Sequence, residues 1–200
     1  MPYNSDRALL LVVSAPSGGG KTTLVNHLRK SIPQINYSIS LTTRQARTGE
    51  RDGTDYHFVS EQEFLKRKEN GELAECAEVH GHWYGTLKSS IDQSLRNRQS
   101  IIFDIDVQGG KSIQALYPES ILIFIAPPSF GVLEARLRAR KQDDETTIQR
   151  RLKAVQKEID QARQHYDYWI INDQLEKAAE KLRCVIIAES LRVEKSSKSQ

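Results

Sequence analysis

Residues 9–28 read LLLVVSAPSGGGKTTLVNHL, and this stretch decides the fold. Leu9–Val13 is an unbroken apolar run, which is typical of a strand buried on both faces of a parallel sheet. Apolar residues at Leu24 and Leu28 share one face of a helix that we expect to begin at about Lys21. A strand, a glycine-rich turn and a helix therefore follow one another directly, which is typical of an α/β fold.

The turn between this strand and this helix matches the phosphate-binding loop pattern G-x-x-x-x-G-K-[ST], except that Ala15 replaces the first glycine. Glycines let backbone N–H groups converge on an anion, and the helix N-terminus adds the positive end of its dipole. Lys21 is expected to be an exposed loop residue that reaches the β- and γ-phosphates of a nucleotide, and the Thr22 hydroxyl to ligate Mg²⁺. The alternative is a glycine-rich turn that contains a lysine by chance. The predicted loop comprises Ala15, Pro16, Ser17, Gly18, Gly19, Gly20, Lys21, Thr22 and Thr23.

The composition excludes several other classes of protein. The 200 residues suffice for one domain, and the formal net charge of +3 suits an anionic ligand without indicating nucleic acid. Cys76 and Cys184 lie far apart and outside any CxxC motif, which argues against a disulfide framework and a zinc site and favours a reducing cytoplasm. The first residues lack the apolar segment of a signal peptide, and no run reaches about 18 apolar residues, so we expect no membrane span.

Strands and helices alternate along most of the chain, which predicts a P-loop NTPase-type α/β fold with a central parallel sheet flanked by helices. The expected strands are Leu9–Val13, Ile101–Ile105, Ile121–Ala126 and Trp169–Ile171. The expected helices are Gly20–Ser31, Gln108–Leu116, Ile148–Ala162 and Gln174–Leu191. The expected boundaries are a core with the phosphate loop at 1–39, a small mixed α/β insertion at 40–97, core at 98–126, a helical lid at 127–151, core at 152–192 and a disordered tail at 193–200.

The insertion contains two local signals. Ser60 and Glu63 form a capping-box pattern, which predicts a short helix that ends near Gly71. The sequence HGHWYG at residues 80–85 is rich in turn residues, so we expect the HWYGT segment to be a turn.

The lid segment begins where Pro127-Pro128 breaks the chain and Ser129 can cap a helix. Several arginines and a polar linker follow. A charged segment between two core elements indicates a mobile lid, and a solvated helical hairpin with surface arginines is an equal alternative. The helix after it carries an apolar stripe that should face the core, formed by Ile148, Leu152, Val155, Ile159 and Ala162.

Arg44 and Arg47, with Tyr56 beyond two glycine-marked turns, form a second dense group of donors. Guanidinium groups bind phosphate bidentately, and a tyrosine hydroxyl adds another donor. A protein that only hydrolyses a nucleotide needs one phosphate site and a water molecule, whereas a kinase of a phosphorylated acceptor needs two phosphate sites that face each other. The sequence therefore predicts a kinase of a small phosphorylated molecule.

Several motifs in a fixed order make the sequence resemble the guanylate kinases, P-loop nucleoside monophosphate kinases that make GDP from GMP and ATP. The resemblance extends from about Leu9 to Leu191. It is carried by SAPSGGGKTT (14–23), TTRQARTGERDGTDYHFVS (42–60), HWYGT (82–86), FDIDVQGGKS (103–112), FIAPPS (124–129) and IINDQLEKA (170–178). The resemblance implies direct in-line transfer of the γ-phosphoryl group of ATP to GMP, with Mg²⁺ and without a covalent enzyme intermediate.

The resemblance also implies roles for individual residues. Those that match ligands of the GMP phosphate are Arg44, Arg47, Tyr56 and Tyr84. Those that match guanine contacts are Ser40, Glu75 and Thr86, with Asp106 as an acidic residue near the guanine. On the ATP side, Asn172 joins the phosphate loop near the adenine, while Thr22 and, through water, Asp104 would hold Mg²⁺. The implied catalytic residues are Lys21, Arg44 and the lid and hinge arginines Arg136, Arg140 and Arg151, which close over the transferring group.

The sequence leaves two alternatives open. A related kinase of another phosphorylated small molecule would keep the phosphate loop and lose the guanine contacts, and Glu75 and Thr86 argue against it. A guanylate-kinase-like interaction module that binds phosphopeptides would typically have a degraded loop, and the intact Lys21 and Thr22 argue against that reading. We expect ATP and GMP as the substrates, and neither nucleic acid nor a membrane as a partner.

Overall fold

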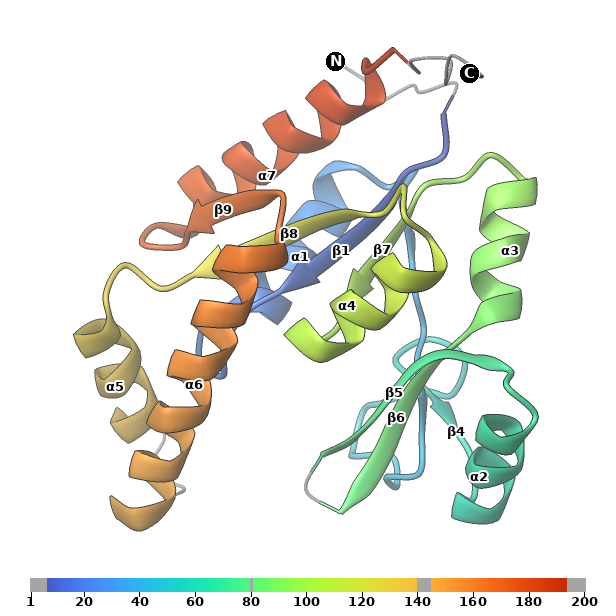
Figure 1. The fold of residues 1–200 in the computed structure, drawn as a ribbon, viewed down its shortest axis with the longest axis horizontal. Helices are drawn as coiled ribbons and strands as arrows, with labels where there is room; N and C mark the ends of the chain where they lie inside the picture. Colours follow the sequence, from blue (N-terminus) through green and yellow to red (C-terminus); the bar gives the residue numbers. More distant parts are fainter. Residues whose placement is uncertain (1–6, 80, 140–144, 194–200) are drawn as a thin grey trace.

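A five-stranded parallel sheet forms the centre of the computed structural model, which describes residues 7–79, 81–139 and 145–193. Its strand order is β2-β7-β1-β8-β9, and every neighbouring pair is parallel (Figure 1). The strands are β1 (Leu10–Ser14), β2 (Asn36–Tyr37), β7 (Ile101–Asp104), β8 (Ile121–Ala126) and β9 (Tyr168–Ile171). Because β1 occupies the middle, the loop that follows it emerges at the centre of the sheet's carboxyl edge.

Helices cover both faces of this sheet. On one face α1 (Lys21–Ser31) and α7 (Leu175–Ser190) pack together over a core that includes Leu11 and Val13. On the other face lie α4 (Val107–Leu116) and α6 (Glu145–His165), over cores that include Val12 and Phe124. Alternate residues of β1 thus point to opposite faces and are all buried, which confirms the prediction of a strand enclosed on both sides.

The predicted core strands and helices are all present, with small shifts at their ends. The prediction does not include β2, because a strand of two residues carries no periodic signal. Helix α6 begins at Glu145 and runs through residue 151, where the lid was expected to end. The expected disordered tail lies outside the described residues, apart from Val193.

In the part of the chain that the structure describes, no helix combines the length and the apolar character that a membrane crossing requires.

A four-stranded sheet forms the centre of the insertion, in the order β4-β3-β6-β5. Its elements and those around it are β3 (Leu41–Thr42), β4 (His57–Phe58), α2 (Glu61–Glu69), β5 (Leu73–Val79), β6 (His82–Leu87) and α3 (Lys88–Arg96). Strand β3 pairs parallel with β4 and antiparallel with β6. Strands and the helices α2 and α3 alternate in this segment, so it combines both kinds of element, as the sequence predicts. The Ser60 hydroxyl accepts a hydrogen bond from the Glu63 N–H at the start of α2, which confirms the predicted helix cap.

The expectation that HWYGT is a turn is wrong. The segment lies in strand β6, antiparallel to β5, and the chain reverses before it, where Gly81 has φ 77°. The glycine inside the motif serves packing, since a Cβ on Gly85 would lie 3.0 Å from both the Glu75 carbonyl oxygen and the Phe64 ring. Trp83 stacks on the same Phe64 ring at 5.8 Å between centroids. A glycine marks a close contact inside a strand here, and local sequence does not distinguish this from a turn.

The segment after Pro128 forms a helical hairpin from α5 (Phe130–Ala139) and the first part of α6. The Ser129 hydroxyl accepts a hydrogen bond from the Val132 N–H at 3.2 Å, which confirms the predicted cap. Leu133 of α5 packs on the apolar stripe of α6 at Ile148. In Figure 1 this hairpin and the β5–β6 hairpin extend from the same end of the central sheet.

Candidate active site

The phosphate loop turns sharply between β1 and α1. Gly20, at the start of α1, has φ 84° and ψ 16°, a left-handed conformation that favours glycine. The Gly19 N–H donates to the Pro16 carbonyl at 2.8 Å, and a Cβ on Gly19 would lie 3.0 Å from the Pro16 oxygen and from the Ala15 Cβ. The shape of the loop therefore requires glycine at both positions, and the buried methyl group of Ala15 fits against it.

Asn172, at the end of β9, ties the phosphate loop to the sheet. Its backbone N–H donates to the Ala126 carbonyl at 2.8 Å, and its side-chain amide donates to the Gly19 carbonyl at 2.9 Å. A Cβ on Gly20 would lie 2.5 Å from that amide nitrogen. Asn172 was expected near the adenine of ATP, and that role stays a prediction. In the structure its buried amide holds the loop backbone at Gly19.

Lys21 folds back onto the sheet. Its Nζ lies 2.6 Å from Asp104 Oδ1 and donates to the Ile105 carbonyl at 2.9 Å, and the lysine side chain is only 19% exposed. Asp104 ends β7, the neighbour of β1, so the pair links the loop to the adjacent strand. The expectation of an exposed lysine is wrong, because its partners come from a distant part of the chain.

Two hard oxygen donors belong to this region: the Thr22 hydroxyl, in the exposed first turn of α1, and the Asp104 carboxylate. Mg²⁺ prefers oxygen ligands, keeps several waters and usually binds one or two carboxylates together with substrate phosphates. A hydroxyl and a carboxylate beside a phosphate loop fit that requirement. Within the described ranges no group of three or more His, Cys, Asp or Glu side chains forms a metal site by itself.

Arg44 is the centre of the second group of donors. Its Nη1 and Nη2 donate to the two carboxylate oxygens of Glu50 at 3.0 and 2.9 Å, and its Nε donates to the Tyr84 hydroxyl at 3.3 Å. The guanidinium carbon lies 5.4 Å from the centroid of the Tyr56 ring, which meets Tyr84 edge to face. Burial raises the pKa of Tyr56 above its ordinary value. Arg47 lies on the same loop with its side chain exposed.

Glu75 lies on β5 and is 8% exposed, which is unusual for a carboxylate. Its Oε1 accepts a hydrogen bond from the Thr86 hydroxyl at 2.6 Å, across the β5–β6 pair. Its Oε2 approaches α4 so closely that a Cβ on Gly109 would lie 3.1 Å away. The pKa of Glu75 is raised to about 7, chiefly by burial and also by the charge of Asp106, while the Thr86 hydrogen bond and the charge of Lys21 oppose the rise.

The two groups of predicted residues meet around Glu75. Lys21 from the phosphate loop and Asp106 both act on its charge, so both lie within electrostatic range. Asp106 caps α4, where its carboxylate accepts a hydrogen bond from the Gly109 N–H at 2.7 Å. Ser40 directly precedes β3, whose Leu41 pairs with the residue before Thr86. The structure therefore brings Glu75, Thr86 and Asp106 together around the start of α4, and the Lys21 ammonium binds the carbonyl of Ile105, the residue before Asp106.

Glu75 should give the unliganded protein a characteristic pH dependence of stability. Its folded-state pKa of about 7 exceeds the ordinary value of 4.5, so its contribution to stability is fully present below 4.5 and is lost as the pH rises through 7. The shift corresponds to about 3 kcal/mol in the free energy of unfolding. Urea denaturation at pH 5 and pH 8 should therefore show that Glu75→Gln gains stability relative to the parent at the higher pH. A pH-independent difference between the two proteins would contradict the shifted pKa, and titrating groups that do not interact with Glu75 cancel in this comparison.

The predicted lid arginines are only partly described. Arg140 and the Arg136 side chain lie outside the described part of the structure. Arg151 is half-buried on α6 and takes part in interactions of its own. Arg138, between the first two, binds Glu134 and also Glu145 of the next helix, so it holds α5 and α6 together.

Sequence reasoning missed two acidic residues of this region. One is Glu50, whose signal is its place three residues after Arg47 in an arginine-rich loop. The other is Glu158 on α6, which is half-buried beside the apolar stripe. Burial raises the pKa of Glu158 to about 7, with a further contribution from Asp106 and an opposing one from Lys21. The sequence signal that could have found Glu158 is its place directly before Ile159, a member of the predicted apolar stripe.

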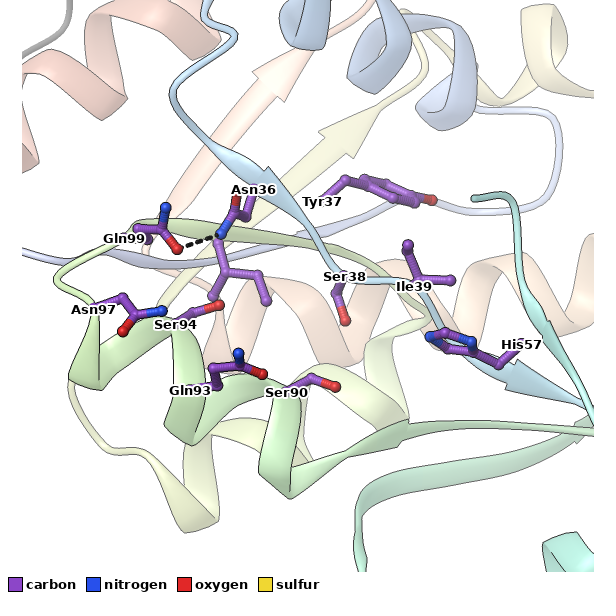
Figure 2. Close-up of a pocket in the computed structure, with 11 residues that line it drawn as sticks. Asn36, Tyr37, Ser38, Ile39, His57, Ser90, Gln93, Ser94, Asn97 and Gln99 are labelled. Carbon is purple, nitrogen blue, oxygen red and sulfur yellow. Dashed lines mark hydrogen bonds between the residues drawn. The ribbon is translucent and has the colours of Figure 1, made fainter. Parts of the chain in front are cut away.

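Figure 2 shows a separate hollow of about 300 Å³ between β2 and α3. The Ser38 hydroxyl in its wall is buried and, among the described residues, has no hydrogen-bond partner. Asn36 and Gln99 bond each other at 3.1 Å at its rim. None of the described residues that line it is Lys, Arg or a predicted site residue, so its wall does not match either predicted phosphate site.

A family model, sequence relatives and a solved structure all match this chain to the same protein family. A family model described as guanylate kinase matches residues 7–189. The chain is 48% identical over 187 residues to a guanylate kinase of Myxococcus xanthus, covering 94% of this chain and 90% of the relative. It is 49% identical over 184 residues to a guanylate kinase of Nitratidesulfovibrio vulgaris, covering 92% and 88%. A crystal structure of guanylate kinase from Anaplasma phagocytophilum matches with a TM-score of 0.75 and 34% identity, covering 94% of this chain and 88% of that chain.

Proposed function

This chain belongs to the guanylate kinase family and transfers a phosphoryl group from ATP to GMP, and we propose that its two groups of donors hold these substrates face to face. The phosphate loop with Lys21 would bind ATP. The group around Arg44 would bind the GMP phosphate, and Glu75 with Thr86 would bind the guanine. The buried Glu75 carboxylate is the observation that supports two adjacent sites. It belongs to the insertion, which would bind GMP, and it lies within electrostatic range of Lys21, which would bind ATP.

The proposed mechanism is direct in-line transfer of the γ-phosphoryl group. The acceptor phosphate is largely ionised at pH 7, since the second pKa of a phosphate monoester is about 6, and no strong general base is needed. Catalysis is then positioning and charge neutralisation. Lys21 would supply positive charge at the transferring group, and Arg44 would orient the acceptor oxygen.

Mg²⁺ is the cation that this chemistry implies, and Thr22 and Asp104 are the residues that would hold it. When bound with ATP, it neutralises phosphate charge and orients the phosphate chain. Asp104 also holds Lys21 before ATP binds, so the same carboxylate keeps the lysine beside the phosphate loop.

We further propose that residues 127–151 act as the lid and residues 40–97 as the GMP-binding unit. The small apolar core that joins α5 to α6 includes Leu152 and Val155, so the lid would move together with the first turns of α6 beyond residue 151. Arg136, Arg140 and Arg151 would bring it positive charge. A closed lid would exclude the water that competes for the phosphoryl group. A cytoplasmic location remains our prediction, supported by two cysteines that are free thiols.

Replacing Arg44 by alanine tests the assignment of the GMP phosphate site. We expect KM for GMP to rise by roughly 10-fold, because one charged hydrogen-bonding partner is lost while Arg47 and both tyrosines remain. KM for ATP should stay nearly unchanged, since the phosphate loop is untouched. Steady-state kinetics with each substrate varied in turn measure both values. A rise in KM for ATP with no change for GMP would overturn the division into two sites.

A further inference from the structure

A carboxylate stands inside the cluster that is proposed to bind the GMP phosphate. Both oxygens of Glu50 accept from Arg44, Oε1 from Nη2 at 2.9 Å and Oε2 from Nη1 at 3.0 Å. The pair is largely enclosed, with the Arg44 side chain 12% exposed and the Glu50 side chain 21% exposed. A negative charge beside a phosphate site weakens anion binding by its charge alone, so its presence needs a physical account.

Glu50 is fixed independently of Arg44. The Arg47 N–H donates to Glu50 Oε2 at 2.8 Å, and the Glu50 N–H donates back to the Arg47 carbonyl at 3.0 Å. The Arg44 guanidinium and the Arg47 N–H also hold the pKa of Glu50 below its ordinary range, so the carboxylate stays ionised near neutral pH. A carboxylate anchored by its own backbone turn is not readily displaced by an arriving phosphate.

Most N–H donors of the Arg44 guanidinium already have a partner within the protein. A guanidinium carries five N–H donors in a rigid plane. Its Nε is used by Tyr84, Nη1 by the Gln45 carbonyl and Glu50, and Nη2 by Glu50. Among the described residues this leaves one N–H, on Nη2. The rings of Tyr56 and Phe58 lie 5.4 and 6.0 Å from the guanidinium carbon and restrict it further.

We propose that Glu50 is a positioning residue for the acceptor phosphate: it holds the Arg44 guanidinium in the orientation that receives GMP. This inference rests on the proposed role of Arg44. A free arginine side chain has many rotamers, and ordering it at the moment of binding weakens affinity. Glu50 orders Arg44 during folding instead, and this gain outweighs the repulsion between the carboxylate and the phosphate. The opposite role, a stand-in for phosphate that GMP must displace, predicts that Kd for GMP falls instead of rising when Glu50 is replaced.

The test is Glu50→Gln, which removes the negative charge and one of the two carboxylate oxygens that accept hydrogen bonds from Arg44. Positioning predicts that Kd for GMP, measured by calorimetry without ATP, rises by roughly 10-fold, as does KM for GMP. KM for ATP should not change, whereas general destabilisation would lower the active fraction without altering either KM. An unchanged or lowered Kd for GMP would overturn the proposal.

Two further variants test whether the effect on GMP binding comes from the geometry of the Glu50–Arg44 pair or from the loss of any carboxylate–arginine pair. Glu50→Asp keeps the charge but shortens the reach, so it should also weaken GMP binding, and parent-like binding would contradict the proposal. Glu63→Gln is the matched control. Glu63 also pairs with an arginine, Arg67 on α2 at 2.7 Å, but in a more exposed position away from the candidate phosphate site, and its loss should leave Kd for GMP unchanged.

The Arg44→Ala background distinguishes a failure of this inference from a failure of the proposed function. If Arg44→Ala alone leaves Kd for GMP unchanged, Arg44 is not a phosphate ligand and the site assignment fails. If Arg44→Ala weakens GMP binding but Glu50→Gln does not, only the positioning role fails. With both roles correct, Glu50→Gln no longer weakens binding once Arg44 is absent, because there is no guanidinium to orient.

Discussion

Replacing Lys21 by alanine is expected to lower kcat by roughly 10²- to 10³-fold, the range observed when one preorganised donor to a developing charge is removed. The reason is the position of its ammonium group, which is held at the phosphate loop by Asp104 and the Ile105 carbonyl before substrate arrives. Lys21→Met, which keeps most of the side chain's volume, should lose activity to the same extent because the charge is the missing element. The measurement is kcat at saturating ATP and GMP.

The Lys21 variants need a stability control, because the structure pairs this lysine with a carboxylate that is only 9% exposed. Leaving Asp104 without its partner destabilises the protein, by less than the roughly 3–5 kcal/mol seen for fully buried pairs because Lys21 keeps some contact with solvent. Calorimetric Kd for GMP should stay near that of the parent if the fold is intact. Lys30→Ala, on the exposed end of the same helix, should keep full activity. Near-normal turnover of folded Lys21→Ala would refute the role of this lysine.

Replacing Glu75 by glutamine is expected to lower kcat/KM for GMP by roughly 10- to 150-fold, the loss of one hydrogen-bonded charged group. Guanine presents two adjacent donors, N1–H and the N2 amino group, and a carboxylate can accept from both. Glutamine keeps the volume and offers Thr86 an acceptor, but it turns one acceptor into a donor that faces the guanine N–H groups. Alanine would instead leave a cavity beside Gly109 and mix packing loss with recognition.

The response of AMP makes this prediction specific. Adenine presents an acceptor at N1, which a carboxylate repels and a glutamine amide can bind, so kcat/KM for AMP should rise or stay constant. The preference for GMP over AMP should therefore fall by at least as much as the activity with GMP. Measuring kcat/KM for both acceptors in both proteins decides the point. If the preference of Glu75→Gln equals that of the parent, Glu75 does not read the base, and Asp106 becomes the residue to replace.

The sequence by itself determined the core of the fold and the phosphate loop. Both are local patterns: Leu9–Val13 forms a strand because every residue is apolar, and Gly19 and Gly20 lie where the backbone turns into a helix. Both patterns involve only residues that are close in sequence, so they can be recognised without knowledge of the rest of the chain. The helix caps at Ser60 and Ser129 were predictable for the same reason, because each involves residues only three apart.

The tertiary structure decided the state of the side chains in the candidate site. Lys21 is enclosed because β7 places Asp104 beside it, and HWYGT is a strand because β5 lies alongside to pair with it. The raised pKa of Glu75 arises from burial against α4, an element that follows it by some thirty residues. Charge pairing and desolvation depend on all the segments that converge on a group, whatever their distance along the chain. Residue types and short spacings therefore predicted the candidate site, and only the folded chain determined which of its charges are paired, buried or held in position.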